Sequence, residues 1–431
     1  MFTMTAALRR FGAAVVALGA VVVVAVAVGA GPAAASNDTY FDVQWNLTQI
    51  RAEEAWASST GSGVTIGIVD TGVQPDHPDL RSKIDATANC VGAPCSEGGA
   101  FDGHGHGTVV AGVAAAITGN GRGVAGVAPD ARLVVAKAVD DRGRASVEDI
   151  NNAIRWVVDQ GARVVNLSLG DPNFLLVSLL GTPLRPGIEY AWSHNAIPVL
   201  ASGNENLGLL DLGSSNYGSL NAVVVGATDK NGGVASYSSP IGSAKWGVVA
   251  PGGSGAGPGS DVLSTYPNGY AWAAGTSMAA PHVSGALALL LAQGMTPLNA
   301  VQRILGTANA SVRCGAGCAG RLDLGAAVTR SATAAPPAPT TPPVTVAPVR
   351  TTTSTSVAAT TTTTVAVSRS TDTTVPELDG RPVAAGRLIE YDADGSGRNP
   401  AFIVVAVALL AGVGASAGTV GWQRFRDGEG W

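Results

Sequence analysis

Charged residues are scarce in this chain of 431 residues, at 13% of the total, and the net charge is only −5. No run of lysines and arginines forms the basic stripe that a nucleic-acid-binding surface needs, so composition excludes nucleic acid as a partner. The remaining composition divides the chain into an apolar N-terminal segment, a mixed segment over 37–330, a Thr/Pro/Ala-rich tract and a final apolar run. The mixed segment alone is long enough to bury a large core.

Cysteine is also rare, with four residues, and no histidine stands close to any of them in the sequence. This absence disfavours a Cys/His metal site, which needs both residue types at short spacing. Four cysteines allow three disulfide pairings. The short spacings within Cys90/Cys95 and within Cys314/Cys318 favour two local disulfides.

The N-terminal segment has the features of a secretory signal peptide over residues 1–35. Arg9 and Arg10 precede an apolar stretch over 11–30, and three alanines at 33–35 form a small-residue cleavage site. The apolar stretch is long, so an uncleaved N-terminal anchor is the alternative. Export in either form makes disulfides permissible.

Charge is almost absent from two C-terminal stretches, residues 331–368 and residues 400–421. Residues 331–399 are rich in Thr, Pro and Ala at their start, which predicts a disordered stalk. Residues 400–421 contain a charge-free stretch that, as a helix of about 30 Å, matches a bilayer core, so we expect a transmembrane helix there. The tail over 422–431 carries two arginines and is expected in the cytoplasm. A buried core helix is the alternative.

The mixed segment alternates buried strands with helices. Residues 65–69 are β-branched and end at Asp70, and similar runs occupy 133–139, 164–169, 197–202 and 222–227. Helical patterns over 109–116 and 147–160 lie between them. This rhythm predicts an α/β fold with a parallel sheet covered on both faces. Ligands of such sheets bind beyond the carboxyl ends of the strands, where Asp70, Ser168 and Asn204 stand.

A serine at the start of an apolar helix is the candidate nucleophile. Ser277 follows Gly275 and Thr276 and precedes apolar residues that run to Leu291. A hydroxyl at a helix N-terminus lies where free N–H groups favour developing negative charge. The hydroxyl is inert at neutral pH unless a base accepts its proton and a third group orients that base.

Two histidines compete for the role of base, His104 and His106. A small-residue helix follows His106 and could hold its imidazole rigidly, whereas His104 stands between two glycines. We therefore predict that His106 is the base.

Three blocks of sequence resemble the signatures of the subtilisin family of serine proteases. They are Asp70-Thr71-Gly72, His106-Gly107-Thr108 and the stretch from Gly275 to His282, in the family's order Asp, His, Ser. The similarity covers roughly residues 37–328. Further blocks agree at residues 77–80, 126–129, 166–170, 202–204 and 250–252.

The resemblance implies a three-layer subtilisin-like fold and a serine endopeptidase whose substrates are proteins or peptides. Ser277 would attack the peptide carbonyl, His106 would transfer the proton, and Asp70 would orient the imidazole. Asn204 would donate to the oxyanion, although a plain turn residue is the alternative for a Gly-Asn pair. No cofactor is required for this chemistry.

The resemblance also implies an edge strand and a calcium site. Ser168, Leu169 and Gly170 would pair with the substrate backbone. A structural calcium would take oxygen ligands, here Asp38, Asp79 and Asn120 with the carbonyls of Ile117, Arg122 and Val124. Solvated carboxylates are the alternative.

The ends of the chain resemble two branches of the family. Residues 37–41 are similar to the mature start of thermitase and follow the signal at once, so we expect no prosegment. A C-terminal membrane helix is typical of mycosins, which serve actinobacterial secretion systems and would imply a secretion-system partner. We expect an extracytoplasmic, single-pass endopeptidase of the cell membrane. A catalytically silent scaffold of such a complex is the alternative, whereas a lipase is excluded because the nucleophile block lacks Gly-x-Ser-x-Gly.

Overall fold

The structure, a computed structural model, describes residues 36–92, 94–169, 183–204, 217–329 and 388–391. The signal peptide, most of the stalk, the transmembrane helix and the tail that the sequence predicts lie outside these ranges. Within them, none of the helices is long and apolar enough to cross a bilayer.

Nine strands of the described residues form one sheet, in the order β11-β8-β7-β6-β5-β1-β4-β2-β3. All neighbouring pairs are parallel except β2 with β3. The strands are β1 (Thr65–Asp70), β2 (Ile84–Asn89), β3 (Ser96–Glu97), β4 (Arg132–Lys137), β5 (Val164–Leu167), β6 (Ile197–Ala201), β7 (Val223–Thr228), β8 (Trp246–Pro251) and β11 (Cys318–Arg321). The predicted α/β fold with a mostly parallel sheet is confirmed.

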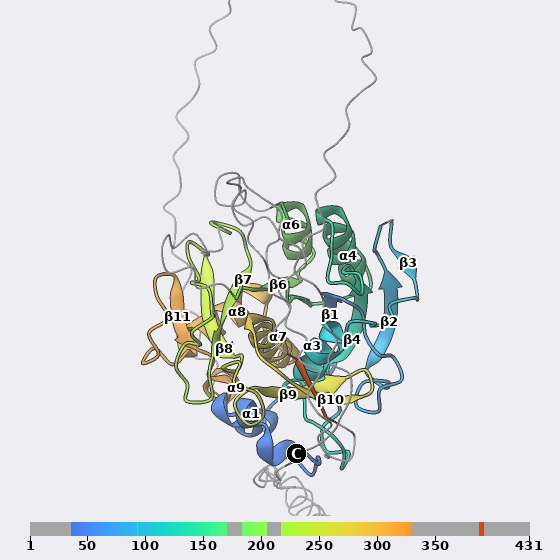
Figure 1. Cartoon of the computed structure of the whole chain (residues 1–431). Helices are drawn as coiled ribbons and strands as arrows, with labels where there is room; N and C mark the ends of the chain where they lie inside the picture. Colours follow the sequence, from blue (N-terminus) through green and yellow to red (C-terminus); the bar gives the residue numbers. More distant parts are fainter. Residues whose placement is uncertain (1–35, 93, 170–182, 205–216, 330–387, 392–431) are drawn as a thin grey trace, which may run out of the picture. The chain divides into compact units, whose positions relative to one another are not determined.

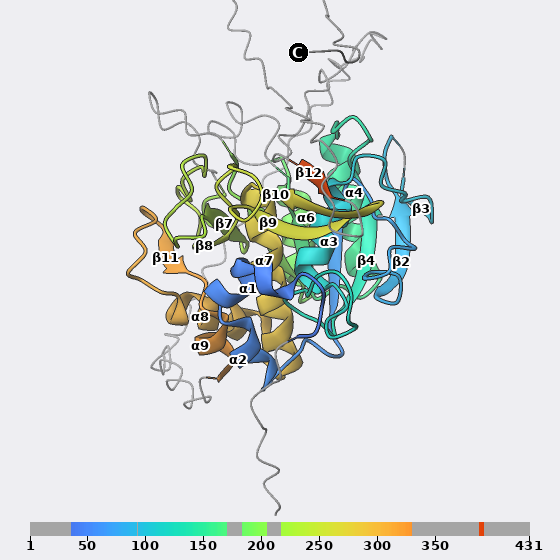
Figure 2. The same cartoon turned by 60° about the horizontal axis from the view of Figure 1, so that its bottom comes forward.

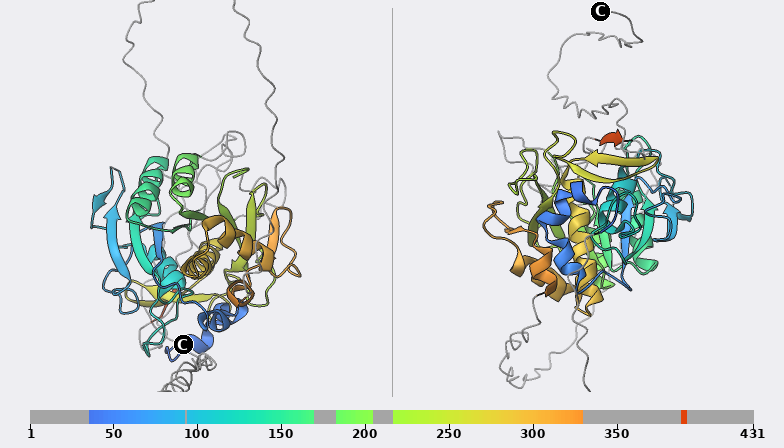
Figure 3. Two further views of the ribbon diagram at one scale, coloured as in Figure 1. Left: turned by 180° about the vertical axis from the view of Figure 1, so that it is seen from behind. Right: turned by 90° about the horizontal axis from the view of Figure 1, so that it is seen from below.

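Helices cover both faces of this sheet (Figures 1 and 3). α3 (His106–Ala115) and α7 (Thr276–Ala292) share one hydrophobic core with Ile66 and Ile68 of β1. α4 (Val147–Asp159) and α6 (Arg185–Ser193) share a second core with Val69, which points to the other face because side chains alternate along a strand. The other helices of the described residues are η1 (Phe41–Val43), α1 (Trp45–Gln49), α2 (Ala52–Trp56), α8 (Pro297–Thr307) and α9 (Leu324–Thr329).

A second, smaller sheet carries an unexpected strand. β9 (Val262–Tyr266) and β10 (Gly269–Ala273) form a hairpin, and β12 (Leu388–Tyr391) pairs with β10 in antiparallel orientation. Figure 2 shows β12, in red, beside β10. β12 belongs to the segment for which the sequence predicts a stalk, and its four residues are mostly β-branched, aliphatic or aromatic, which suits a strand better than a Thr/Pro tract does.

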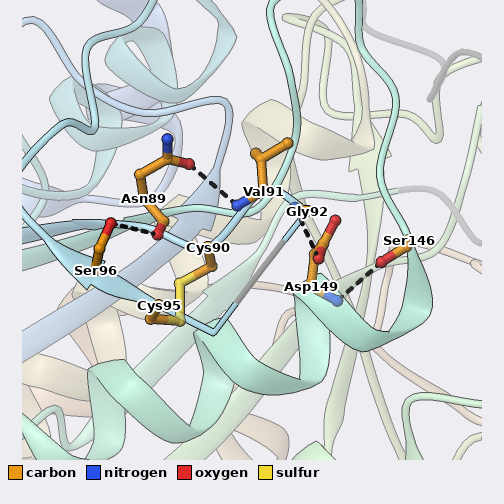
Figure 4. Close-up of a disulfide and its surroundings, with 8 residues drawn as sticks. All are labelled: Asn89, Cys90, Val91, Gly92, Cys95, Ser96, Ser146 and Asp149. Carbon is orange, nitrogen blue, oxygen red and sulfur yellow. Dashed lines mark hydrogen bonds between the residues drawn. A yellow bond between two sulfur atoms is a disulfide. The ribbon is translucent and has the colours of Figure 1, made fainter.

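Both predicted local disulfides are present. One joins Cys90 to Cys95 and the other joins Cys314 to Cys318, which leaves no free cysteine. Figure 4 shows that the first closes a turn beside the N-terminus of α4, where Asp149 accepts the Gly92 N–H at 3.1 Å. This short loop is therefore attached both to its own strand and to a helix.

Candidate active site

Asp70 and His106 are brought together by the first strand and the third helix. Asp70 ends β1 at the carboxyl edge of the sheet, and His106 begins α3. Oδ1 of Asp70 lies 2.7 Å from Nδ1 of His106, and both side chains are buried. An acceptor on Nδ1 fixes the tautomer in which Nε2 is unprotonated and can act as a base.

The electrostatics of this pair favour a charged imidazole. Burial lowers the pKa of His106, but the charge and hydrogen bond of Asp70, with the charge of Asp102, outweigh it, so the net pKa is raised. The second histidine has the opposite shift, because burial and the charge of His106 lower the pKa of His104. Of the two rings, whose centroids are 6.3 Å apart, only His106 has a carboxylate partner in the described residues.

Asp102 positions the histidine loop, a role that the sequence analysis missed. Its carboxylate accepts the hydroxyl of Thr71 at 2.8 Å, the N–H of Gly105 at 2.8 Å, and both the N–H and the hydroxyl of Thr108, at 2.8 and 2.6 Å. Burial raises the pKa of this carboxyl, but these hydrogen bonds outweigh it and lower the net pKa. An acidic residue just before a predicted helix N-terminus was the available signal.

Asp102 therefore joins the start of α3 to the residue that follows Asp70. Thr71 completes the connection, since its hydroxyl also accepts the Gly107 N–H at 2.9 Å. The two catalytic candidates are held in one hydrogen-bonded frame rather than by their own contact alone.

Ser277 is the second residue of α7, at the helix N-terminus that the sequence predicts. Pro281 lies four residues later and has no N–H, so the helix cannot supply a donor to the Ser277 carbonyl. The hydroxyl of Ser168 supplies it instead, at 2.7 Å. The Ser168 hydroxyl oxygen in turn accepts a hydrogen bond from the side-chain NH₂ of Asn166 at 2.8 Å. The side-chain oxygen Oδ1 of Asn166 accepts the hydroxyl of Ser284 at 2.8 Å.

The nucleophile and the base are not hydrogen-bonded to each other in this structure. The Ser277 hydroxyl donates to the carbonyl of Ser168 at 3.0 Å, and within the described part of the chain Nε2 of His106 has no partner although it is buried. An active site without substrate often has loose catalytic hydrogen bonds. An Asp-His-Ser triad would require the hydroxyl to turn from the Ser168 carbonyl toward Nε2.

Asn204 lies beside the first turn of the nucleophile helix, three residues beyond β6. Its side-chain oxygen Oδ1 accepts both the N–H and the hydroxyl of Thr276, at 2.8 and 2.9 Å. These bonds orient the amide so that its NH₂ group remains to donate. The Ser277 N–H belongs to the same first turn, whose N–H groups have no intrahelical acceptor. The Asn204 side chain and the Ser277 N–H therefore both lie at the N-terminus of α7.

The predicted substrate strand is described only in part. Ser168 and Leu169 follow β5 and are buried, and Gly170 lies outside the described residues.

Three of the predicted calcium ligands, Asp38, Asp79 and Asn120, are linked by hydrogen bonds. The N–H groups of Gly119 and Asn120 donate to Asp38 at 2.8 and 2.9 Å, and the Asn120 amide donates to Asp79 at 2.8 Å. The other oxygen of Asp79 accepts the Val124 N–H at 3.1 Å and the hydroxyl of Tyr270 at 2.9 Å. Two loops and the N-terminal residues are thereby joined around two carboxylates.

The carboxylates of Asp38 and Asp79 could balance the charge of a bound cation, and neither forms an ion pair within the described residues. Both residues are buried. Burial raises the pKa of Asp79, against its hydrogen bonds, which lower it. No cluster of three or more His, Cys, Asp or Glu side chains suited to a metal occurs in the described ranges. Carbonyls of the 117–124 loop would have to supply the remaining ligands.

A family model, curated sequences and a solved structure all relate this chain to the same family of proteases. Residues 61–339 match the model of the Subtilase family. Thermitase from Thermoactinomyces vulgaris is 38% identical over 277 residues, which are 63% of this chain and 91% of thermitase. Subtilisin Savinase from Lederbergia lenta is 39% identical over 250 residues, 58% of this chain and 84% of that protein. A solved protease structure from Pseudoalteromonas arctica matches with a TM-score of 0.56 at 29% identity, covering 68% of this chain and 98% of its own.

Proposed function

We propose that this chain, which belongs to the subtilase family and is a serine endopeptidase, works as a membrane-anchored enzyme outside the cytoplasm. Its substrates are proteins or peptides, as the family implies. The observation that carries the chemistry is the contact of 2.7 Å between Asp70 and His106 at the edge where Ser277 and Asn204 also lie. The location rests on the sequence of the two ends.

The proposed reaction starts when the Ser277 hydroxyl leaves the Ser168 carbonyl and turns toward Nε2 of His106. Oγ attacks the peptide carbonyl carbon while Nε2 accepts the proton, and Asp70 stabilises the resulting imidazolium. The imidazolium then protonates the leaving amine, which breaks the C–N bond and leaves an acyl-enzyme on Ser277. Water repeats the sequence, with His106 as base, and releases the acid.

The oxyanion of each tetrahedral intermediate would be held by the Asn204 amide and the Ser277 N–H. Both donors are fixed before the reaction, one by Thr276 and the other by the helix. Fixed donors stabilise developing charge without reorganising during the reaction. Ser168, Leu169 and Gly170 would align the residues before the scissile bond by backbone pairing.

Three features support a location outside the cytoplasm with a membrane anchor. The N-terminal segment reads as a secretory signal, both cysteine pairs are disulfide-bonded, and residues 400–421 read as a transmembrane helix. Disulfides persist in oxidising compartments. A secretion-system complex at the same membrane is the proposed partner, on the sequence resemblance to mycosins alone.

One experiment tests both parts of this proposal. We expect the full chain to be labelled by a fluorophosphonate probe in the membrane fraction, and a chain truncated after Arg330 to be labelled in the medium. Ser277→Ala in each chain should abolish labelling, because the probe reacts with an activated serine hydroxyl. A membrane-bound truncated chain would show that the N-terminal segment is an uncleaved anchor, and an unlabelled but folded full chain would indicate a silent scaffold.

We also propose that calcium stabilises the fold between Asp38 and Asp79, with Asn120 and the carbonyls of Ile117, Arg122 and Val124. The cation would balance two buried carboxylates that have no other counter-charge in the described residues. The ion would contribute to stability alone, since none of these residues belongs to the proposed triad.

Chelation should lower the thermal midpoint of unfolding by about 5 °C, because a ligand bound only by the folded state stabilises it by mass action. Differential scanning fluorimetry with EGTA, followed by calcium add-back, measures this shift. Asp79→Asn should lower the midpoint and remove its response to calcium. If the midpoint is unchanged after EGTA treatment, and the treated protein is shown to be free of metal, the hydrogen bonds alone hold the loop.

A further inference from the structure

The strand β12 meets the catalytic domain next to the nucleophile. Its register pairs Leu388 with Ala273 and Tyr391 with Tyr270. Ala273 ends β10 only four residues before Ser277. The strand therefore begins at the end of β10 that leads into the nucleophile helix and runs away from it (Figure 2).

The hairpin to which β12 is added also flanks the catalytic base. The hydroxyl of Thr265 in β9 donates to the Thr108 carbonyl at 2.7 Å, and that of Ser264 donates to the Val109 carbonyl at 2.8 Å. Tyr266 packs so closely on Gly105 that a Cβ there would lie 2.2 Å from its ring. Gly105 has φ of 95° and directly precedes His106, so only glycine suits both its conformation and its contact.

The inference rests on the proposed function: if His106 is the base and acid of the reaction, this position places the hairpin on the leaving-group side. His106 protonates the amine that departs, so the part of the substrate after the scissile bond must pass the imidazole. The residues before the scissile bond would pair with Ser168 and Leu169 instead, as proposed above. β10 has one edge paired with β9, and its other edge is the one that β12 occupies.

We propose that this outer edge of β10 is a strand-binding surface of the leaving-group side, and that residues 388–391 occupy it in competition with the substrate. A strand edge presents unpaired N–H and C=O groups, and an extended peptide binds it chiefly through its backbone. A segment of the same chain has a high effective concentration, so even a short strand competes with a diffusing peptide. Long substrates are restrained by this competition and short leaving groups are not.

Engineered cysteines in the full chain test the register. Ala271 and Glu390 are directly opposite in the ladder, so Ala271→Cys with Glu390→Cys should form a disulfide under mild oxidation. The matched control is Ala271→Cys with Ile389→Cys, because the register pairs Ile389 with Trp272 and not with Ala271. All four native cysteines are already paired, so peptide mapping identifies the new bond. Equal cross-linking of the two pairs, or none in the first, overturns the pairing.

Activity tests the competition. Two substrates share the residues before the scissile bond, taken from cleavage sites in casein; one is an anilide, and the other continues for several residues after that bond. We expect Ile389→Pro, which removes a strand N–H, to raise kcat/KM for the longer substrate by about fivefold or more. The anilide value should stay within about twofold, because an anilide does not reach the strand. Ala358→Pro, in the stalk, is the control and should change neither.

The oxidised Ala271→Cys, Glu390→Cys enzyme should show the reverse effect. Its kcat/KM for the longer substrate should fall by about tenfold, with the anilide again little changed, since a covalent bond holds the competitor in place. Fluorophosphonate titration counts the folded active sites in every variant. An equal change for both substrates, or no change for the longer one in either variant, overturns the proposal.

Discussion

His106→Ala should lose about 10⁴- to 10⁶-fold in kcat/KM for peptide hydrolysis, whereas His104→Ala should stay within about tenfold of the unchanged enzyme. Only His106 has the Asp70 carboxylate on its Nδ1, at 2.7 Å, and a buried Nε2 without a partner in the described residues. His104 lacks an orienting carboxylate, so it cannot be held as a base. Initial rates on casein and on a peptide anilide, normalised to folded protein, measure both effects.

The pH profile gives an independent check on the same assignment. Nε2 can accept a proton only when the imidazole is neutral, so activity should fall as the pH drops through the pKa of His106. Asp70 raises that pKa against burial. Asp70→Asn should therefore move the acid limb of kcat/KM to lower pH and lower kcat by about 10⁴-fold. An acid limb that stays in place in Asp70→Asn, or a larger loss in His104→Ala than in His106→Ala, would contradict the assignment.

The local patterns of the sequence predicted the parts of the site that depend on neighbouring residues. The β-branched run that ends at Asp70 is β1, and the helix expected after His106 begins at that residue. The helix at Ser277 and both short disulfides also agree. Each of these follows from strand and helix periodicity or from short spacing.

The spatial proximity of the proposed triad residues could not be predicted from local patterns, because Asp70, His106 and Ser277 are far apart in the sequence. No periodicity gives a distance between them, and the expectation that they meet came from the family resemblance. The hydrogen bond from the Ser168 hydroxyl to the Ser277 carbonyl could not be predicted either, since it joins two residues that are 109 positions apart. Pro281 is visible in the sequence, but its effect on the Ser277 carbonyl appears only once the helix is placed.

The second sheet was not predicted from the sequence. The turn between β9 and β10 has a recognisable sequence signal, whereas the signal for β12 is weak. Pro267 and Asn268 separate β9 from β10, and a Pro-Asn pair followed by Gly269 between two β-rich runs is a turn signal. β12 has only four residues, and its partner strand is more than a hundred residues away in the sequence. Such a strand depends on tertiary pairing rather than on its own propensity.

Asn204→Leu should lower kcat by about 10²- to 10³-fold, or roughly 2.7–4 kcal/mol of transition-state stabilisation, as loss of the corresponding donor does in subtilisin. The change removes the NH₂ group but keeps a side chain of similar size. KM should change by less than about threefold, because the donor acts on the oxyanion and not on the bound peptide. Steady-state kinetics on a peptide anilide separate kcat from KM.

Thr276 provides the matched control, because its hydroxyl and N–H both donate to Asn204 and hold the amide in place. Thr276→Val removes the hydroxyl and leaves the N–H, so kcat should fall by only about tenfold, and Thr276→Ser should restore most of it. If Asn204→Leu raises KM without lowering kcat, Asn204 binds the ground state and is not an oxyanion donor. If Thr276→Val costs as much as Asn204→Leu, the loss comes from disturbance of the α7 N-terminus, and the Ser277 N–H would be the principal donor.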